Sequence, residues 1–140
     1  MFVRNAMTPD PACCTPMSSL QSVACMMIDN NCGEIPVVDD HESRRPVGVI
    51  TDRDITTRTV ARGINPLEAT AGEHMSSPCI TVKPDDSLAG CCSVMETQQL
   101  RRVLVVDDDG RLCGIVSLAD VAKNAGREAI GEVVQEVSQP

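Results

Sequence analysis

The 140-residue chain has no tryptophan, no tyrosine and a single phenylalanine, Phe2. A planar ligand therefore cannot be stacked on a Trp or Tyr ring. The chain also lacks any apolar run near the roughly 20 residues that span a bilayer, and its start, MFVRNAMTPD, lacks the apolar core of a secretory signal. We expect a cytoplasmic protein with no membrane segment.

Basic residues are scarce, with 12 Lys and Arg against 20 Asp and Glu and a formal net charge of −8. Nucleic acids and anionic membranes are bound by basic surfaces, so we expect neither as a partner. Any anion must be held by local donors. The 42% of hydrophobic residues and 23% of charged residues are typical of a globular domain with a core.

Histidine is also rare, because only His41 and His74 are present. Neither has a partner fixed by sequence, and no nucleophile stands beside a base, so we expect no catalytic residue and no enzyme. No two cysteines have the C-x-x-C spacing of a zinc site, and we expect no metal site. Small buried hydrophobes are the default interpretation of the eight cysteines, which are Cys13, Cys14, Cys25, Cys32, Cys79, Cys91, Cys92 and Cys113.

The chain does contain an internal repeat, which indicates a duplicated unit of about 60 residues. A shift of 68 residues matches the first half to the second up to the two VVDD segments, at 37–40 and 105–108. The shift is 66 residues beyond them, because DDHESRRPVG is two residues longer than DDDGRLCG, as a hairpin turn tolerates. The matched pairs include Met7 with Met75, Pro16 with Pro84, Gly48 with Gly114, Thr51 with Ser117, and Asp54 with Asp120. Six cysteines match Val, Ala, Ser or Leu, which favours packing over redox chemistry.

Each unit is predicted to form a strand, a helix, two strands and a helix, in an α+β fold. ACCT and ITVK are short strands, and Ser19 and Ser87 are candidate N-caps of the first helices. EIPVVD with PVGVIT, and RVLVVD with LCGIVS, are predicted hairpins. Further helices are expected at about 52–62, about 118–124 and 127–138. We divide the chain into repeats 1–63 and 64–124 and a C-terminal helix or tail, 125–140.

With AMTPDPACCTP, IPVVDD and GVITDRDI in the first unit, and HMSSPCITVKPDDSL, RRVLVVDDDG and GIVSLADV in the second, the chain resembles a pair of cystathionine-β-synthase (CBS) domains. The resemblance covers residues about 4 to 124, and the linker VARGINPLEATAGEHM also looks like that of small bacterial proteins made of one such pair. It implies two repeats packed sheet to sheet about a pseudo-twofold axis. Two clefts, each lined by both repeats, are expected between them.

The resemblance also implies the ligand-binding residues. Backbone near Thr8 and Ala12 would meet Ser117 and Asp120 in one cleft, and backbone near Ser76 and Ile80 would meet Thr51 and Asp54 in the other. Each hydroxyl stands where a strand becomes a helix and can donate to a phosphate, and each Asp can accept from both hydroxyls of a ribose. The same pairs also fit a capping box, which stays open as an alternative.

Arg101 and Arg102 either add positive charge at the phosphates or are solvated surface arginines. Without Trp or Tyr, aliphatic and thiol side chains would have to sandwich an adenine.

The resulting hypothesis is a regulatory module that binds AMP or ATP, with NAD and then S-adenosylmethionine as further candidates. It would act as a homodimer and signal to an unknown effector protein, without a catalytic cofactor. Two alternatives stay open: a structural adaptor dimer with empty clefts, and a redox or metal sensor that uses the cysteines.

Overall fold

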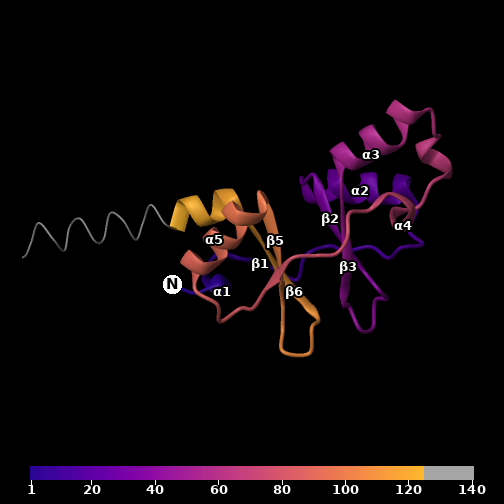
Figure 1. Cartoon of the computed structure of the whole chain (residues 1–140). Coiled ribbons are helices and arrows are strands. Elements are labelled where there is room, and N and C mark those ends of the chain that lie inside the picture. The colour runs from indigo at the N-terminus through magenta and orange to yellow at the C-terminus, as the bar shows by residue number, and fades with distance from the viewer. Residues whose placement is uncertain (125–140) are drawn as a thin grey trace, which may run out of the picture.

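The computed structural model describes residues 1–124, so the helix expected over 127–138 lies outside the described residues. Two α/β halves lie side by side, with the strands between the helices (Figure 1). The first half is built from α2 (Leu20–Asn30), β2 (Glu34–Val38), β3 (Pro46–Thr51) and α3 (Asp52–Arg58). The second is built from β4 (Thr81–Val82), α5 (Leu88–Gln98), β5 (Arg102–Val106), β6 (Leu112–Ser117) and helical residues 118–124. Within residues 1–124, no helix is long and apolar enough to cross a bilayer.

The first helix of each half begins at the serine predicted to cap it. Ser19 Oγ accepts from the backbone N–H of Ser22 at 3.1 Å, and Ser87 Oγ accepts from that of Gly90 at 3.0 Å. Each cap satisfies a donor that the helix itself leaves unpaired. Both helices end at a residue in the left-handed conformation, Asn31 or Gln99. The repeat in the sequence is therefore a repeat in the local structure.

The two predicted hairpins form in the same register. In β2–β3, Val37 lies opposite Gly48, and in β5–β6, Val105 lies opposite Gly114. Each ladder shifts by one step immediately afterwards, before the turn whose length differs between the repeats. An irregularity there lets turns of different length join strands of equal length.

Each sheet is completed by the segment that precedes the other repeat. The second half has strand order β1-β6-β5-β4, in which β1 (Thr8–Pro9) comes from the N-terminus. The first half repeats this order through two isolated bridges, Cys14 with Val37 and Val49 with Ser76. α1 (Val3–Ala6) accordingly contacts α5, and α4 (Ala71–His74) contacts α3. The boundary predicted at 63/64 refers to the repeats in the sequence, and it stays a prediction.

Two expected elements differ from prediction. The strand ACCT is reduced to the single bridge at Cys14, because prolines on both sides, Pro11 and Pro16, supply no N–H to a ladder. The helix expected over 52–62 is interrupted at Thr59, whose φ and ψ of −117° and −73° separate α3 from a 3₁₀ turn, η1 (Val60–Arg62). A second such turn, η2 (Pro66–Glu68), precedes α4.

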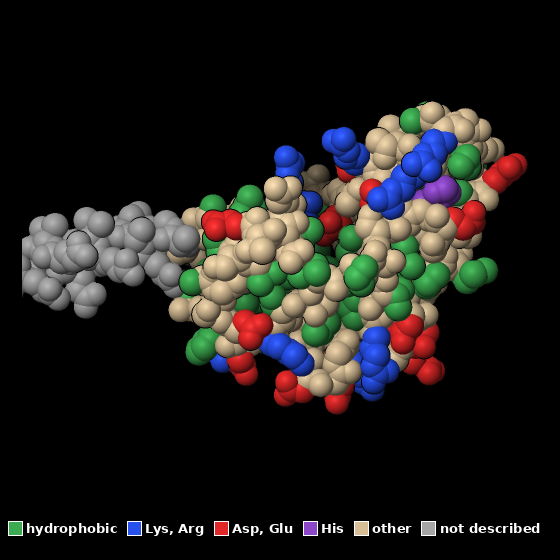
Figure 2. All heavy atoms as spheres, viewed as in Figure 1, with side chains coloured by type: hydrophobic (Ala, Val, Ile, Leu, Met, Phe, Trp, Pro, Cys, Tyr) green, Lys and Arg blue, Asp and Glu red, His purple; other side chains and the backbone are tan. Residues whose placement is uncertain are grey.

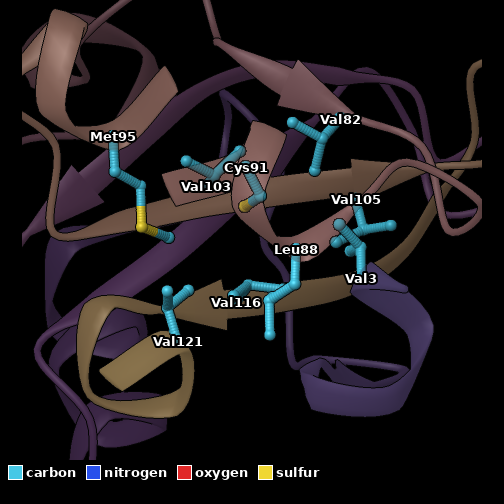
Figure 3. Close-up of a cluster of buried hydrophobic side chains, with 9 residues drawn as sticks. All are labelled: Val3, Val82, Leu88, Cys91, Met95, Val103, Val105, Val116 and Val121. Carbon is cyan, nitrogen blue, oxygen red and sulfur yellow. The ribbon is translucent and has the colours of Figure 1, made fainter. Parts of the chain in front are cut away.

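Three buried clusters hold the fold together. The nine side chains labelled in Figure 3 come from α1, α5, β4, β5, β6 and residues 118–124 and point toward one another. A matching cluster around Leu20, Ile35 and Ile50 lies in the first half. Between the halves, Val38, Leu104 and Leu112 form the third cluster, which joins the two sheets. Burial of this apolar surface is the main favourable term in holding the halves together.

Candidate functional site

A cavity of about 300 Å³ lies between the two halves, where β2 and β5 begin and β6 ends. Figure 2 shows a hollow between the halves on the helical side, with basic side chains on its rim. Five of the ten predicted site residues line the cavity: Thr8, Ala12, Arg102, Ser117 and Asp120. The other lining residues are Pro11, Asn30, Asn31, Cys32, Glu34, Ile35, Pro36 and Ile115.

Ser117 and Asp120 form a capping box at the start of the helical residues 118–124. The backbone N–H of Asp120 donates to Ser117 Oγ at 3.1 Å, and that of Ser117 donates to Asp120 Oδ2 at 3.1 Å. The capping interpretation therefore describes these atoms correctly. Among residues 1–124, Asp120 Oδ1 has no hydrogen-bond or ion-pair partner, so one carboxylate oxygen is left for a ligand.

The opposite wall is held in place by close contact between β1 and β6. Thr8 lies opposite Ile115 in the ladder, and a Cβ added at Gly114 would come within 2.5 Å of Met7 Sδ and 3.2 Å of the Thr8 carbonyl oxygen. Only glycine fits there without a shift of the wall. Gly114 thus sets the distance between the Thr8 wall and the end of β6, where Ser117 lies.

Two opposite charges line the cavity at equivalent positions in the repeats, because Glu34 is the first residue of β2 and Arg102 is the first residue of β5. Burial raises the pKa of Glu34, while Arg102 opposes the rise and Asp54 adds to it. Arg102 is the cationic side chain among the lining residues. Arg101 is exposed and is not a lining residue; its carbonyl oxygen accepts from the Leu118 N–H at 2.7 Å.

The second predicted cleft has the same capping box but different contents. The Asp54 N–H donates to Thr51 Oγ1 at 3.0 Å, and the Thr51 N–H donates to Asp54 Oδ2 at 3.1 Å. Asp54 Oδ1 lies 3.5 Å from Arg58 Nη2, which also donates to Ser76 Oγ at 3.0 Å. Ile80, which was predicted to line this cleft together with Ser76, is half-buried and makes none of these contacts.

Sequence reasoning missed the part of the cavity wall formed by the end of α2 and the start of β2. Asn30, Asn31 and Glu34 lie in this part. A signal was present, because the repeat places Glu34 opposite Arg102. The opposite charges at these matched positions indicate that the first residues of β2 and β5 have different roles.

The cysteines do not gather into a metal-binding group. All eight are free, and burial raises the pKa of Cys14 to about 12 and that of Cys79 to about 11. Within residues 1–124, no three His, Cys, Asp or Glu side chains are grouped so that they could hold a metal ion.

Comparison with protein families gives two matches to the model described as CBS domain, at residues 3–60 and 71–126. Hypoxic response protein 1 of Mycobacterium tuberculosis is 34% identical over 137 residues, which are 98% of this chain and 94% of that protein. CBS domain-containing protein YhcV of Bacillus subtilis is 34% identical over 137 residues, 97% of this chain and 94% of its own length.

Two solved structures are similar over most of the chain. A crystal structure of Hypoxic Response Protein I with two coordinated zinc ions has a TM-score of 0.78 at 33% identity, covering 88% of this chain and 98% of that one. The CBS domain pair of MJ0100, in complex with 5′-methylthioadenosine and S-adenosyl-L-methionine, has a TM-score of 0.79 at 26% identity, covering 91% and 98%.

Proposed function

Because this chain belongs to the CBS domain family, with matches at residues 3–60 and 71–126, we propose that it is a regulatory module that binds an adenosine-containing ligand. The observation that carries the proposal is the cavity of about 300 Å³ that brings Thr8, Ala12, Arg102, Ser117 and Asp120 together. That volume lies at the lower end of the range for small-molecule sites, roughly 300 to 1,000 Å³.

The cavity offers each part of such a ligand a suitable partner. The free oxygen of Asp120 can accept from a ribose hydroxyl, and Arg102 can pair with a phosphate. Pro11, Ile35 and Ile115 supply apolar contacts for an adenine in place of an aromatic ring. AMP and ATP lead because Arg102 is a cation; NAD follows. S-adenosylmethionine is supported by the complex of the MJ0100 pair.

A titration tests the proposal. Without Trp or Tyr the protein absorbs little at 280 nm, so in equilibrium dialysis the excess adenine absorbance near 260 nm on the protein side measures the bound ligand. AMP, ATP, NAD and S-adenosylmethionine are titrated into the wild type and into Asp120→Ala. We expect one of them to bind the wild type and to bind the variant at least 10-fold more weakly. No binding to the wild type, or equal binding to both, would contradict the proposal.

The module is further proposed to be a non-catalytic homodimer that signals to a separate effector protein. A pull-down with and without the bound nucleotide tests the second part, because a sensor changes its partner binding when its ligand is present. Partner binding that is the same in both conditions, together with no nucleotide binding, would instead indicate an adaptor dimer.

A further inference from the structure

Arg58, the last residue of α3, spans the second predicted cleft. Its Nη1 donates to the His74 carbonyl oxygen at 2.7 Å, and its Nη2 donates to Ser76 Oγ at 3.0 Å and lies 3.5 Å from Asp54 Oδ1. Asp54 is the carboxylate expected to hold a ribose, and Ser76 belongs to the opposite wall. The guanidinium therefore joins the two walls between which a ligand would have to enter.

Among residues 1–124, no such side chain bridges the first cleft. The repeat places Asn124 at the position of Arg58. Asn124 Nδ2 donates to the carbonyl oxygen of Asp120 at 2.7 Å, so this side chain turns back onto its own helix. Thr8, the counterpart of Ser76, lines the open cavity with Asp120. The difference between Arg58 and Asn124 thus distinguishes the cleft that a side chain bridges from the cleft that is open.

Charge explains why the arginine is held there. Burial raises the pKa of Glu34, Arg102 lowers it, and repulsion from the nearby Asp54 carboxylate raises it further. A cation beside Asp54 offsets this repulsion. A ribose, which is neutral, would displace that cation from Asp54 and leave the carboxylates without it. The same loss would follow for any uncharged group that entered.

We propose that each chain binds a single adenosine ligand, in the Ser117/Asp120 cleft, because Arg58 acts as a built-in occupant of the Thr51/Asp54 cleft. This inference rests on the proposed function and adds its stoichiometry and the residue that sets it. It also assigns Arg58 and Asn124 as the pair of positions that distinguish the two halves.

Equilibrium dialysis against AMP, ATP, NAD and S-adenosylmethionine in turn, read at 260 nm, counts ligands per chain. For the compound that binds, we expect one per wild-type chain and two per chain of Arg58→Asn. The reciprocal variant, Asn124→Arg, should bind at least 10-fold more weakly, because its guanidinium can reach Asp120 as Arg58 reaches Asp54. Circular dichroism of both variants checks that they are folded.

The outcomes separate the two proposals. Two ligands per wild-type chain would overturn the single-site inference and leave the proposed function standing, whereas none would overturn both. A folded Arg58→Asn that still binds one ligand would show that Arg58 does not close the cleft. If Arg58→Asn does not fold, Asn124→Arg decides, since unchanged affinity in that variant overturns the inference.

Discussion

Asp54 and Asp120 make the same two capping bonds, yet their second carboxylate oxygens have different fates. Asp54 Oδ1 lies 3.5 Å from Arg58, whereas Asp120 lines the cavity and its Oδ1 has no hydrogen-bond or ion-pair partner among residues 1–124. The capping and ligand-binding interpretations are therefore compatible at Asp120, because each uses a different oxygen. Under the proposed function, Asp120 would contribute to both stability and ligand binding, and the two contributions can be measured separately.

Asp120→Ala should lower stability by about 1 kcal/mol, because it removes one cap, and Asp54→Ala should cost at least as much, because it also removes the ion pair with Arg58. Urea denaturation measures this loss. Only Asp120→Ala should weaken the ligand, since a charge-assisted bond of about 1.5 to 3 kcal/mol corresponds to about 10- to 150-fold in affinity. Equal affinity losses in the two variants would contradict the assignment.

The buried thiols predict how stability depends on alkaline pH. Burial raises the pKa of Cys14 to about 12 and that of Cys79 to about 11, from an ordinary value of 9.0. A raised pKa in the folded state means that the neutral thiol stabilises the fold below pH 9, and that this stability is lost as the pH rises toward 11 to 12. We expect the melting temperature to fall over that interval.

Alkylation measured by mass spectrometry gives a second readout of the same thiols. At pH 8, Cys14 should react with iodoacetamide far more slowly than the exposed Cys25, because burial both blocks access and keeps Cys14 protonated. Similar rates at the two residues in the folded protein would show that Cys14 is not the packing residue described here.

At the scale of elements, two glycines allow the segments that precede the repeats to pack closely against the hairpins. Ser76 approaches β3 at Gly48, and Thr8 approaches β6 at Gly114. A Cβ at Gly48 would come within 2.8 Å of the Ser76 carbonyl oxygen, whereas at Gly114 the nearest backbone atom, the Thr8 carbonyl oxygen, is at 3.2 Å and the closer atom is a flexible Met7 sulfur. Gly48→Ala should therefore destabilise more than Gly114→Ala, each by about 1 to 3 kcal/mol.

Chemical denaturation ranks the two glycine variants. Because Gly114 sets the Thr8 wall of the cavity, Gly114→Ala should also weaken nucleotide binding even though it costs less stability. Greater destabilisation by Gly114→Ala would mean that the side chain of Met7 is less adaptable than the backbone at Ser76.

The elements that the sequence predicts well are those fixed by neighbouring residues. Ser19 and Ser87 cap their helices through the N–H three residues ahead, and the hairpins follow from two adjacent apolar runs. β1 was missed because its partner, β6, is more than 100 residues away, and Thr8 and Pro9 carry no strand pattern of their own. Local patterns do not encode such pairings.

The same reason explains what was missed in the sites. The capping pairs were visible because their members are three residues apart. Arg102 was singled out, whereas Glu34 was missed, although the repeat places the two at equivalent positions. Arg58 was not singled out, because its partners His74 and Ser76 lie 16 and 18 residues away and meet it only through the exchanged α4 segment. The asymmetry of the clefts therefore appears only in three dimensions.

For the molecule as a whole, each half depends on a segment from the other repeat. α1 precedes the first repeat but packs in the second half, and α4 precedes the second repeat but packs in the first half. Val3 is fully buried in the core of the second half, and Ala71 is fully buried in that of the first. A force or ligand that moves one half therefore acts on a segment of the other. If the proposed ligand binds between the halves, this connection gives it a route to alter the surface that a partner would contact.

Exposed apolar side chains on the surface predict how two copies of the chain associate. Large apolar side chains stay exposed on and after the helices that follow Thr51 and Ser117, with Val60 at 60% and Leu118 at 44%. Exposed apolar side chains at equivalent helices of the two repeats can be covered by a second copy, as at many homodimer interfaces. We therefore expect a homodimer, with twice the 15.0 kDa mass of the chain, in light scattering.

Charge placed on this surface should divide the dimer. The double variant Val60→Asp/Leu118→Asp is expected to be monomeric at concentrations where the wild type is dimeric, because burying two carboxylates costs more than the apolar contact returns. Ile28→Asp is the matched control, since Ile28 is 79% exposed on α2, which is not one of those helices, and its variant should stay dimeric. A wild-type mass of 15.0 kDa at every concentration would overturn the dimer, and dissociation by Ile28→Asp alone would place its interface on α2 instead.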